Sequence, residues 1–158
     1  MSRKISELSS KEVLAIAIQI EKENGDCLRK FADAFEGHNK EVAQKFRELA
    51  EEEDCHHEWL SQKFKRRFHG EVPAPPTADV EGLKQALAWD ESEFKVFDSL
   101  KAEKIFQMAL ETENRARSFY QEAERTAIDK SLALLFRQLA TMEDDHAGWL
   151  EERIKATA

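Results

Sequence analysis

Residues 49–56, with the sequence LAEEEDCH, decide the fold, because they return near the C-terminus as residues 139–146, LATMEDDH. The residues around them match in the same register: Phe46 with Phe136, Trp59 with Trp149, and Leu60 with Leu150. Upstream of each copy, residues 21–23 (EKE) correspond to residues 113–115 (ENR). The chain is therefore interpreted as a duplicated unit, which predicts a site with approximate two-fold symmetry.

Around these copies, apolar residues recur at helical spacing along four stretches. The pattern predicts helices over about residues 10–36, 40–67, 99–127 and 130–156. Ser9 and Glu12 form a predicted capping box for the first helix, while Asn39, and Asp98 or Ser99, are candidate N-caps for the second and third. With only five Gly and three Pro among 158 residues, the chain is expected to be helical almost throughout.

The connections between these helices differ in length. Breaks near Gly37 and Asp129 are short and make two antiparallel hairpins, whereas residues 68–98 form a long crossover that contains all three prolines. Residues 79–89 within the crossover also fit a short helix. Two hairpins that bury their apolar stripes against each other predict an all-α fold, a four-helix bundle in a single domain over residues 1–158.

Composition and charge argue against several classes of function. The formal net charge of −8 argues against an extended surface for nucleic acid or for an anionic membrane. The polar N-terminus lacks the apolar core of a signal peptide, and no apolar run approaches the length of about 20 residues that a bilayer-spanning helix needs. Two cysteines, Cys27 and Cys55, are too few for a disulfide framework. We therefore expect a soluble protein of the reducing cytoplasm.

The middle of every predicted apolar stripe holds ionisable residues where apolar ones belong. The six residues are Glu21, Glu53, His56, Glu113, Glu143 and His146. An ionised carboxylate that is buried without a partner costs several kcal/mol, and four at one level would also repel one another. Because antiparallel helices of similar length bring their midpoints to one level, two bound cations would relieve both problems.

The spacing of these residues favours a metal site. In Glu53-x-x-His56 and Glu143-x-x-His146 the two side chains lie on one helical face, so each pair can give a carboxylate and an imidazole to the same ion. Such a set suits iron or manganese and is also compatible with zinc. A single Glu-x-x-His on an acidic helix is usually a solvated face. Two copies at matched positions, each with a further Glu on the preceding helix, favour the metal site instead.

Two segments resemble the rubrerythrin branch of the ferritin-like superfamily. Residues 109–120 (ALETENRARSFY) are similar to its E-x-x-A-x-x-F-Y helix, and residues 139–146 are similar to its L-A-x-x-E-x-x-H helix. The resemblance extends over nearly the whole chain. It implies a ferritin-like bundle with a carboxylate-bridged di-iron centre that reduces hydrogen peroxide. The implied carboxylate ligands are Glu21 and Glu113 on the first and third helices, and Glu53 and Glu143 beside their histidines.

Three departures from the family pattern bear on function. The paired CxxC motifs of a rubredoxin module do not occur in this sequence, so electrons would come from a separate donor such as a rubredoxin-like protein. The positions of an extra glutamate, which the family uses as an alternative ligand, hold Asn24 and Ala116. The family's tyrosine near the metals occurs once, as Tyr120, and its repeat counterpart is Leu28. The ligand set is then closer to the four-Glu, two-His set shared with ferritins and bacterioferritins.

Several residues near the predicted site have both a functional and a structural interpretation. Tyr120 could hydrogen-bond a ligand carboxylate across the bundle or simply pack in the core. Trp59 and Trp149 follow their histidines and either wall the site from water or fill the core. His57 also shares a helical face with Glu53, but its repeat counterpart is Ala147, which favours His56 as the ligand.

Other reactive or charged residues are assigned no chemistry. Cys27 and Cys55 are offset by about 12 Å along antiparallel helices, which is beyond disulfide reach, so both are expected to be packing residues. The charged clusters at residues 51–52 and 63–67 are interpreted as solvated faces. His38 and His69 lie in predicted turns.

These observations lead to a functional hypothesis with two alternatives. The principal one is a di-iron oxidoreductase that reduces hydrogen peroxide, or dioxygen, with electrons from an external donor, as a homodimer or small homo-oligomer. The first alternative is a ferroxidase or iron-storage protein whose substrate is Fe(II). The second is a structural or sensing module that binds metal without turnover.

Overall fold

The computed structural model describes residues 3–74 and 97–157. Its elements are a short 3-10 helix, η1 (Ile5–Glu7), and four long helices, α1 (Ser10–Phe35), α2 (Lys40–Phe68), α3 (Ser99–Thr126) and α4 (Lys130–Thr157). The helix ends lie one residue from the expected ones: 35 against 36, 68 against 67, 126 against 127 and 157 against 156. The short helix expected over residues 79–89 lies outside the described residues.

Side-chain caps begin the helices where the sequence predicts them. The Ser9 hydroxyl accepts from the Glu12 N–H at 3.2 Å while the Glu12 carboxylate accepts from the Ser9 N–H at 2.8 Å, which confirms the capping box of α1. Asn39 and Asp98 each accept a backbone N–H three residues later, at 3.1 and 3.0 Å, and so cap α2 and α3. Asp129 accepts the N–H groups of Ser131 and Leu132 at the start of α4.

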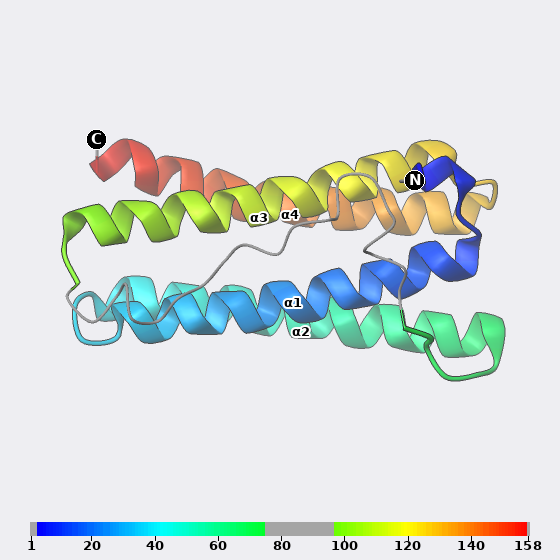
Figure 1. Ribbon diagram of the computed structural model, residues 1–158, viewed down its shortest axis with the longest axis horizontal. Helices are drawn as coiled ribbons and strands as arrows, with labels where there is room; N and C mark the ends of the chain where they lie inside the picture. The colour runs from blue at the N-terminus through cyan, green and yellow to red at the C-terminus, as the bar shows by residue number, and fades with distance from the viewer. Residues whose placement is uncertain (1–2, 75–96, 158) are drawn as a thin grey trace.

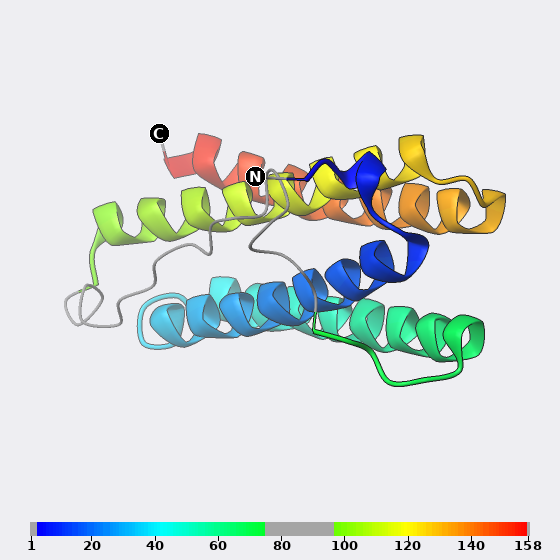
Figure 2. The same ribbon diagram turned by 45° about the vertical axis from the view of Figure 1, so that its right-hand side comes forward.

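The four helices form an all-α bundle of two antiparallel hairpins. Figures 1 and 2 show α1 running alongside α2 in one layer and α3 alongside α4 in the other. Contacts between the hairpins include those between α1 and α3. The predicted four-helix bundle is therefore confirmed.

The core is divided into two apolar clusters at opposite ends of the bundle. One contains Leu14, Phe64 and Phe136, and the other contains Phe31 and Phe46. The six ionisable residues singled out in the sequence lie between these clusters along each helix. The fold thus places a polar layer at the middle of the bundle, with apolar packing above and below it.

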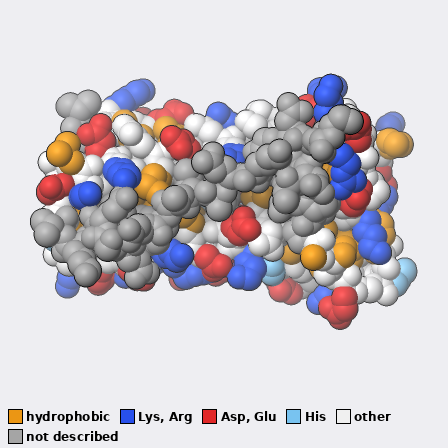
Figure 3. Space-filling model, viewed as in Figure 1, with side chains coloured by type: hydrophobic (Ala, Val, Ile, Leu, Met, Phe, Trp, Pro, Cys, Tyr) orange, Lys and Arg blue, Asp and Glu red, His pale blue; other side chains and the backbone are white. Residues whose placement is uncertain are grey.

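The surface is charged in both signs. Figure 3 shows acidic and basic side chains interspersed on the face that is viewed. Within the described residues, no helix combines the length and the apolar character needed to cross a membrane.

Candidate metal centre

The six predicted ligands come together from all four helices. Their side chains are buried: the four glutamates are 0% exposed, and the two histidines are 8% and 3% exposed. α1 and α3 contribute one glutamate each, while α2 and α4 each contribute a glutamate and a histidine at Glu-x-x-His spacing. The residues are Glu21 on α1, Glu53 and His56 on α2, Glu113 on α3, and Glu143 and His146 on α4.

Their potential ligand atoms form two overlapping groups. In each group, one atom from each of four residues lies within 4.8 Å of the others. The groups are Glu21, Glu53, His56 and Glu143, and Glu53, Glu113, Glu143 and His146. Glu53 and Glu143 belong to both groups, so each can bridge two ions, whereas every other residue can serve only one. The sequence left open which carboxylates are shared.

The buried oxygens of the cluster are short of partners. Among the described residues, both carboxylate oxygens of Glu113 and of Glu143, and Oε2 of Glu53, have no hydrogen-bond partner. Buried polar atoms are normally paired, so this concentration of unpaired acceptors requires an explanation. Cations supply it, and a mixed carboxylate and imidazole set is chemically suited to two divalent ions of the first transition row. The residues present therefore fit a di-metal site.

Both histidines direct the same ring nitrogen at the cluster. Nδ1 of His56 lies 3.3 Å from Glu21 Oε2 and 3.4 Å from Glu53 Oε2. Nδ1 of His146 lies 3.0 Å from Glu53 Oε1 and 3.5 Å from Glu113 Oε2. The two rings are nearly parallel, with 14° between their planes and 6.3 Å between their centroids. The duplicated sequence thus produces the approximate two-fold arrangement that it predicted.

The metal-free cluster holds protons. Burial is the main cause that raises the pKa of Glu21 well above its usual range, and the neighbouring Glu53 raises it further. For Glu113, burial and the neighbouring Glu143 raise the pKa in the same way. Burial also acts on Glu53, but its close contacts with Glu21 and His146 outweigh burial and lower its pKa. Burial also opposes the charged form of His146, but the nearby carboxylates of Glu113, Glu143 and Glu53 raise its pKa. Metal ions that bind here must displace these protons.

Tyr120 joins the two hairpins at this site. It is fully buried on α3, and its hydroxyl donates to Glu21 Oε1 on α1 at 2.5 Å. Burial and the adjacent Glu21 raise the pKa of Tyr120 well above its usual value, which keeps the O–H protonated. Its repeat counterpart, Leu28, packs in the apolar cluster instead. Glu21 therefore has a hydroxyl donor, whereas both carboxylate oxygens of Glu113 lack a hydrogen-bond partner in the described structure.

Glu52 is the contact that sequence reasoning missed. Interpreted from the sequence as part of a solvated face, it is indeed 55% exposed, but its Oε2 lies 2.6 Å from Nε2 of His146. The contact crosses from α2 to α4. A signal was present in the repeat, because the residue matching Glu52 is Met142.

Other residues singled out in the sequence lie outside the cluster. Trp149 is partly buried and packs edge-on against Phe46 of the second apolar cluster, with 5.7 Å between ring centroids, whereas Trp59 is 39% exposed and is not part of the buried core. Cys27 and Cys55 are both free, as expected from their offset. Burial raises the pKa of the Cys27 thiol to about 11, so it stays protonated.

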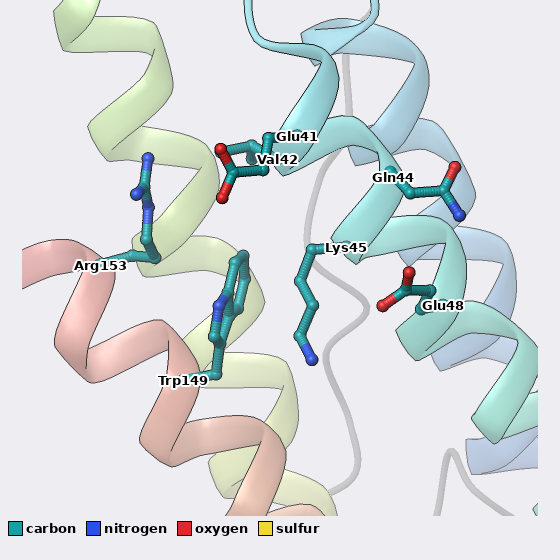
Figure 4. Close-up of a pocket in the computed structure, with 7 residues that line it drawn as sticks. All are labelled: Glu41, Val42, Gln44, Lys45, Glu48, Trp149 and Arg153. Carbon is teal, nitrogen blue, oxygen red and sulfur yellow. The ribbon is translucent and has the colours of Figure 1, made fainter.

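A groove of about 330 Å³ opens between α2 and α4. Figure 4 shows Trp149 and Arg153 of α4 on one side of it, and Glu41, Lys45 and Glu48 of α2 on the other. None of the six predicted ligands lines this groove. It is therefore a neighbouring surface feature rather than the cluster itself.

Comparisons with known proteins bear on the family and the fold of this chain. A family model described as Rubrerythrin matches residues 12–101 and 104–158. A hypothetical protein from Pyrococcus furiosus has the same fold, with a TM-score of 0.74 and 24% identity over 97% of this chain and 92% of that one. An uncharacterised conserved protein from Magnetospirillum magnetotacticum MS-1 gives a TM-score of 0.77 and 24% identity over 96% and 97%.

The two structural likenesses support the fold alone, since sequence identity is low. No curated protein matches the chain by sequence. The family model, in contrast, spans well over half of the chain, including all six residues of the buried cluster. The chain therefore belongs to the rubrerythrin family.

Proposed function

We propose that this protein is a di-iron oxidoreductase that reduces hydrogen peroxide to water. The observation that carries the proposal is the pair of overlapping four-residue groups that share Glu53 and Glu143, in a chain of the rubrerythrin family. A bound pair of ferrous ions would supply the two electrons that, with two protons, convert one hydrogen peroxide to two waters.

The chain's own part is to place and neutralise the metals. Four ionised glutamates would balance the charge of two divalent cations, and Glu53 and Glu143, which belong to both four-residue groups, would help to hold both ions. The apolar clusters at both ends of the layer limit the entry of water. Tyr120 keeps an O–H at Glu21 Oε1, which orients that carboxylate and holds a proton next to the metal position.

Electrons for turnover would come from outside this sequence. Its two cysteines are too few for the paired CxxC motifs of a rubredoxin module, and both are free in the structure. We therefore propose a rubredoxin-like protein as donor, in the cytoplasm, to a homodimer or small homo-oligomer of this chain.

The direct test is stopped-flow oxidation of anaerobic protein loaded with Fe(II), with hydrogen peroxide and dioxygen compared at equal concentration. We expect the ferric absorbance to rise much faster with peroxide. Glu143→Ala is the matched control, because it removes one shared carboxylate and should abolish the fast phase. Faster oxidation by dioxygen than by peroxide would overturn the peroxidase proposal.

The second candidate is an iron-handling ferroxidase whose substrate is Fe(II). It is favoured by the ligand set, because Asn24 and Ala116 occupy the positions where an alternative glutamate ligand would lie. Storage needs a hollow shell of many subunits, so sedimentation velocity separates the two proposals. A dimer or small oligomer would exclude storage, and a 24-subunit particle would exclude the peroxidase. Elemental analysis of the purified protein would distinguish iron from manganese and zinc.

A further inference from the structure

The ring of His146 has polar contacts on both of its nitrogens. Nδ1 faces the buried cluster, where Glu53, Glu113 and Glu143 lie 3.0, 3.5 and 3.6 Å away. Nε2 points the other way and lies 2.6 Å from Oε2 of Glu52. The His146 side chain is 4% exposed, whereas that of Glu52 is 55% exposed. His146 therefore lies between the buried carboxylates and one carboxylate at the surface.

This arrangement determines which nitrogen is free to bind a metal ion. A neutral imidazole carries one proton, so a ring that ligates through Nδ1 must carry it on Nε2. Glu52 accepts a hydrogen bond from that Nε2–H, which selects the required tautomer and limits rotation of the ring. A carboxylate in this position also makes the imidazole a stronger base toward the metal. Because Glu52 lies on α2 and His146 on α4, the effect depends on how the two hairpins pack.

The other half of the centre lacks an equivalent acid. Met142 occupies the repeat position of Glu52, and a thioether is at most a weak acceptor without charge. In the part of the chain that the structure describes, the polar contacts of His56 all run through Nδ1. The two imidazole rings are nearly parallel and face the cluster in the same way. The halves thus differ outside the ligand set rather than within it.

We propose that Glu52 is a positioning residue for His146 and makes the metal position on His146 tighter than the one on His56. This inference rests on the proposed di-metal function. Loss of an outer partner of this kind typically weakens metal binding by about 10- to 100-fold. Since Glu52 is partly solvated, we expect the lower end of that range. The two positions should therefore fill in sequence, with the His146 position first.

The experiment is calorimetric and spectroscopic titration of the full chain with Co²⁺ alone. His56→Ala leaves the His146 position as the main site, and His146→Ala leaves the His56 position. Glu52→Ala should weaken Co²⁺ binding about tenfold in the His56→Ala background and should change the Co²⁺ absorption bands. In the His146→Ala background it should have no effect, because the ring that Glu52 contacts is gone. Glu52→Gln keeps an acceptor without the charge and should restore part of the affinity.

Two further variants complete the design. Glu51→Gln removes one negative charge from the adjacent exposed residue and should leave Co²⁺ affinity unchanged, which separates the contact from a general charge effect. Met142→Glu supplies the missing acid and should tighten binding in the His146→Ala background. Thermal unfolding of the metal-free variants checks that all of them fold.

The outcomes separate this inference from the proposed function. Equal weakening by Glu51→Gln and Glu52→Ala would reduce the effect to net charge and overturn the inference. Unchanged Co²⁺ affinity in Glu52→Ala, with two ions still bound by the unmodified protein, would overturn the inference and leave the di-metal proposal standing. No Co²⁺ binding by the unmodified protein would overturn both.

Discussion

The α1–α2 hairpin and the α3–α4 hairpin carry the same ligand set in different surroundings. Each gives two glutamates and one histidine to the centre. Around them, the first hairpin provides Glu52 and the second provides Tyr120, and the repeat counterparts of these residues are Met142 and Leu28. Each of the two additions reaches across to a ligand of the other hairpin. Symmetry therefore holds for the atoms that would touch metal and fails for the atoms that orient them.

The ion pairs on the surface next to the ligands are also similar, but not identical, in the two hairpins. The aspartate that follows each shared glutamate binds an arginine of its own hairpin: Asp54 binds Arg29 and Asp144 binds Arg117. The repeat counterpart of Arg117 is Gly25, and a Cβ there would lie 3.0 Å from Asp54 Oδ1. The duplicated contact is thus made with an arginine from a different position.

The largest expected effect comes from the residues that the two halves share. Glu53→Ala or Glu143→Ala removes a carboxylate from both four-residue groups, so each variant should lose tight binding of both ions. Elemental analysis after dialysis measures the metal content, and Glu151→Gln on the exposed face of α4 is the control. Two ions retained in both variants would show that the cluster is not the metal site.

Residues that belong to one half should remove one ion each. His56→Ala and His146→Ala each leave the other four-residue group intact, so each should bind one ion where the unmodified protein binds two. The same elemental analysis applies, with His57→Ala as a neighbouring histidine control. Loss of both ions in either single variant would mean that the two positions bind only as a pair.

The pH dependence of the stability of the metal-free protein tests whether the cluster holds protons. The folded-state pKa values of Glu21 and Glu113 lie above the unfolded value of about 4.3, so the folded state binds more protons and stability is lost as pH rises. His146 adds to this loss above its unfolded pKa of about 6.5. Glu53 is ionised in both states above about pH 5 and contributes no slope there.

We therefore expect the Tm of metal-free protein to fall between about pH 5 and 8, and that of the metal-loaded protein not to follow it. Glu113→Gln and Glu21→Gln should each flatten this dependence, because each removes a carboxyl group whose pKa is raised in the folded state. Differential scanning calorimetry at constant ionic strength measures the Tm at each pH. A Tm of the metal-free protein that rises over this window would contradict the protonated cluster.

Tyr120→Phe tests the difference in hydrogen bonding between the halves, in which Glu21 of the first hairpin has a hydroxyl donor and Glu113 of the second has none in the described structure. The substitution keeps the ring but leaves Glu21 Oε1 without its donor, which should destabilise the protein by about 1–3 kcal/mol. Chemical denaturation of the metal-free protein measures the free energy of unfolding. Leu28→Ala in the second apolar cluster is a control that creates a cavity without touching a carboxylate. An unchanged free energy of unfolding would show that the hydroxyl contributes only to metal binding or to chemistry.

The smallest effect should come from the surface ion pairs. Asp54→Ala and Asp144→Ala each remove an exposed pair with N–O distances of 2.8 and 2.6 Å, and such pairs typically contribute about 0.2–1 kcal/mol. The two variants should therefore unfold at similar denaturant concentrations and keep their full metal content. A loss of bound ion in only one of them would show that its pair supports the neighbouring glutamate.

Part of the site was accessible from the sequence because buried charge is costly. Glu21 or His146 in an apolar stripe is unfavourable unless a partner is present, so helical periodicity alone singles out such residues. Glu52 escaped the same reasoning because it lies on an exposed face, where a carboxylate needs no explanation. The difference between the exposed Trp59 and the half-buried Trp149 was also missed, since both follow their histidines by three residues and were interpreted alike.

By itself, the sequence determined the helix bounds, the hairpin repeat and the six candidate ligands. Those features depend on local hydrogen bonding, caps and the period of the helix, which are properties of each segment. Only the tertiary structure decided that Glu53 and Glu143 are shared, that Tyr120 reaches Glu21 and that Glu52 reaches His146. These contacts depend on the axial register and rotation of one hairpin against the other. Side-chain packing between helices sets both, and the helical period of a single segment does not encode them.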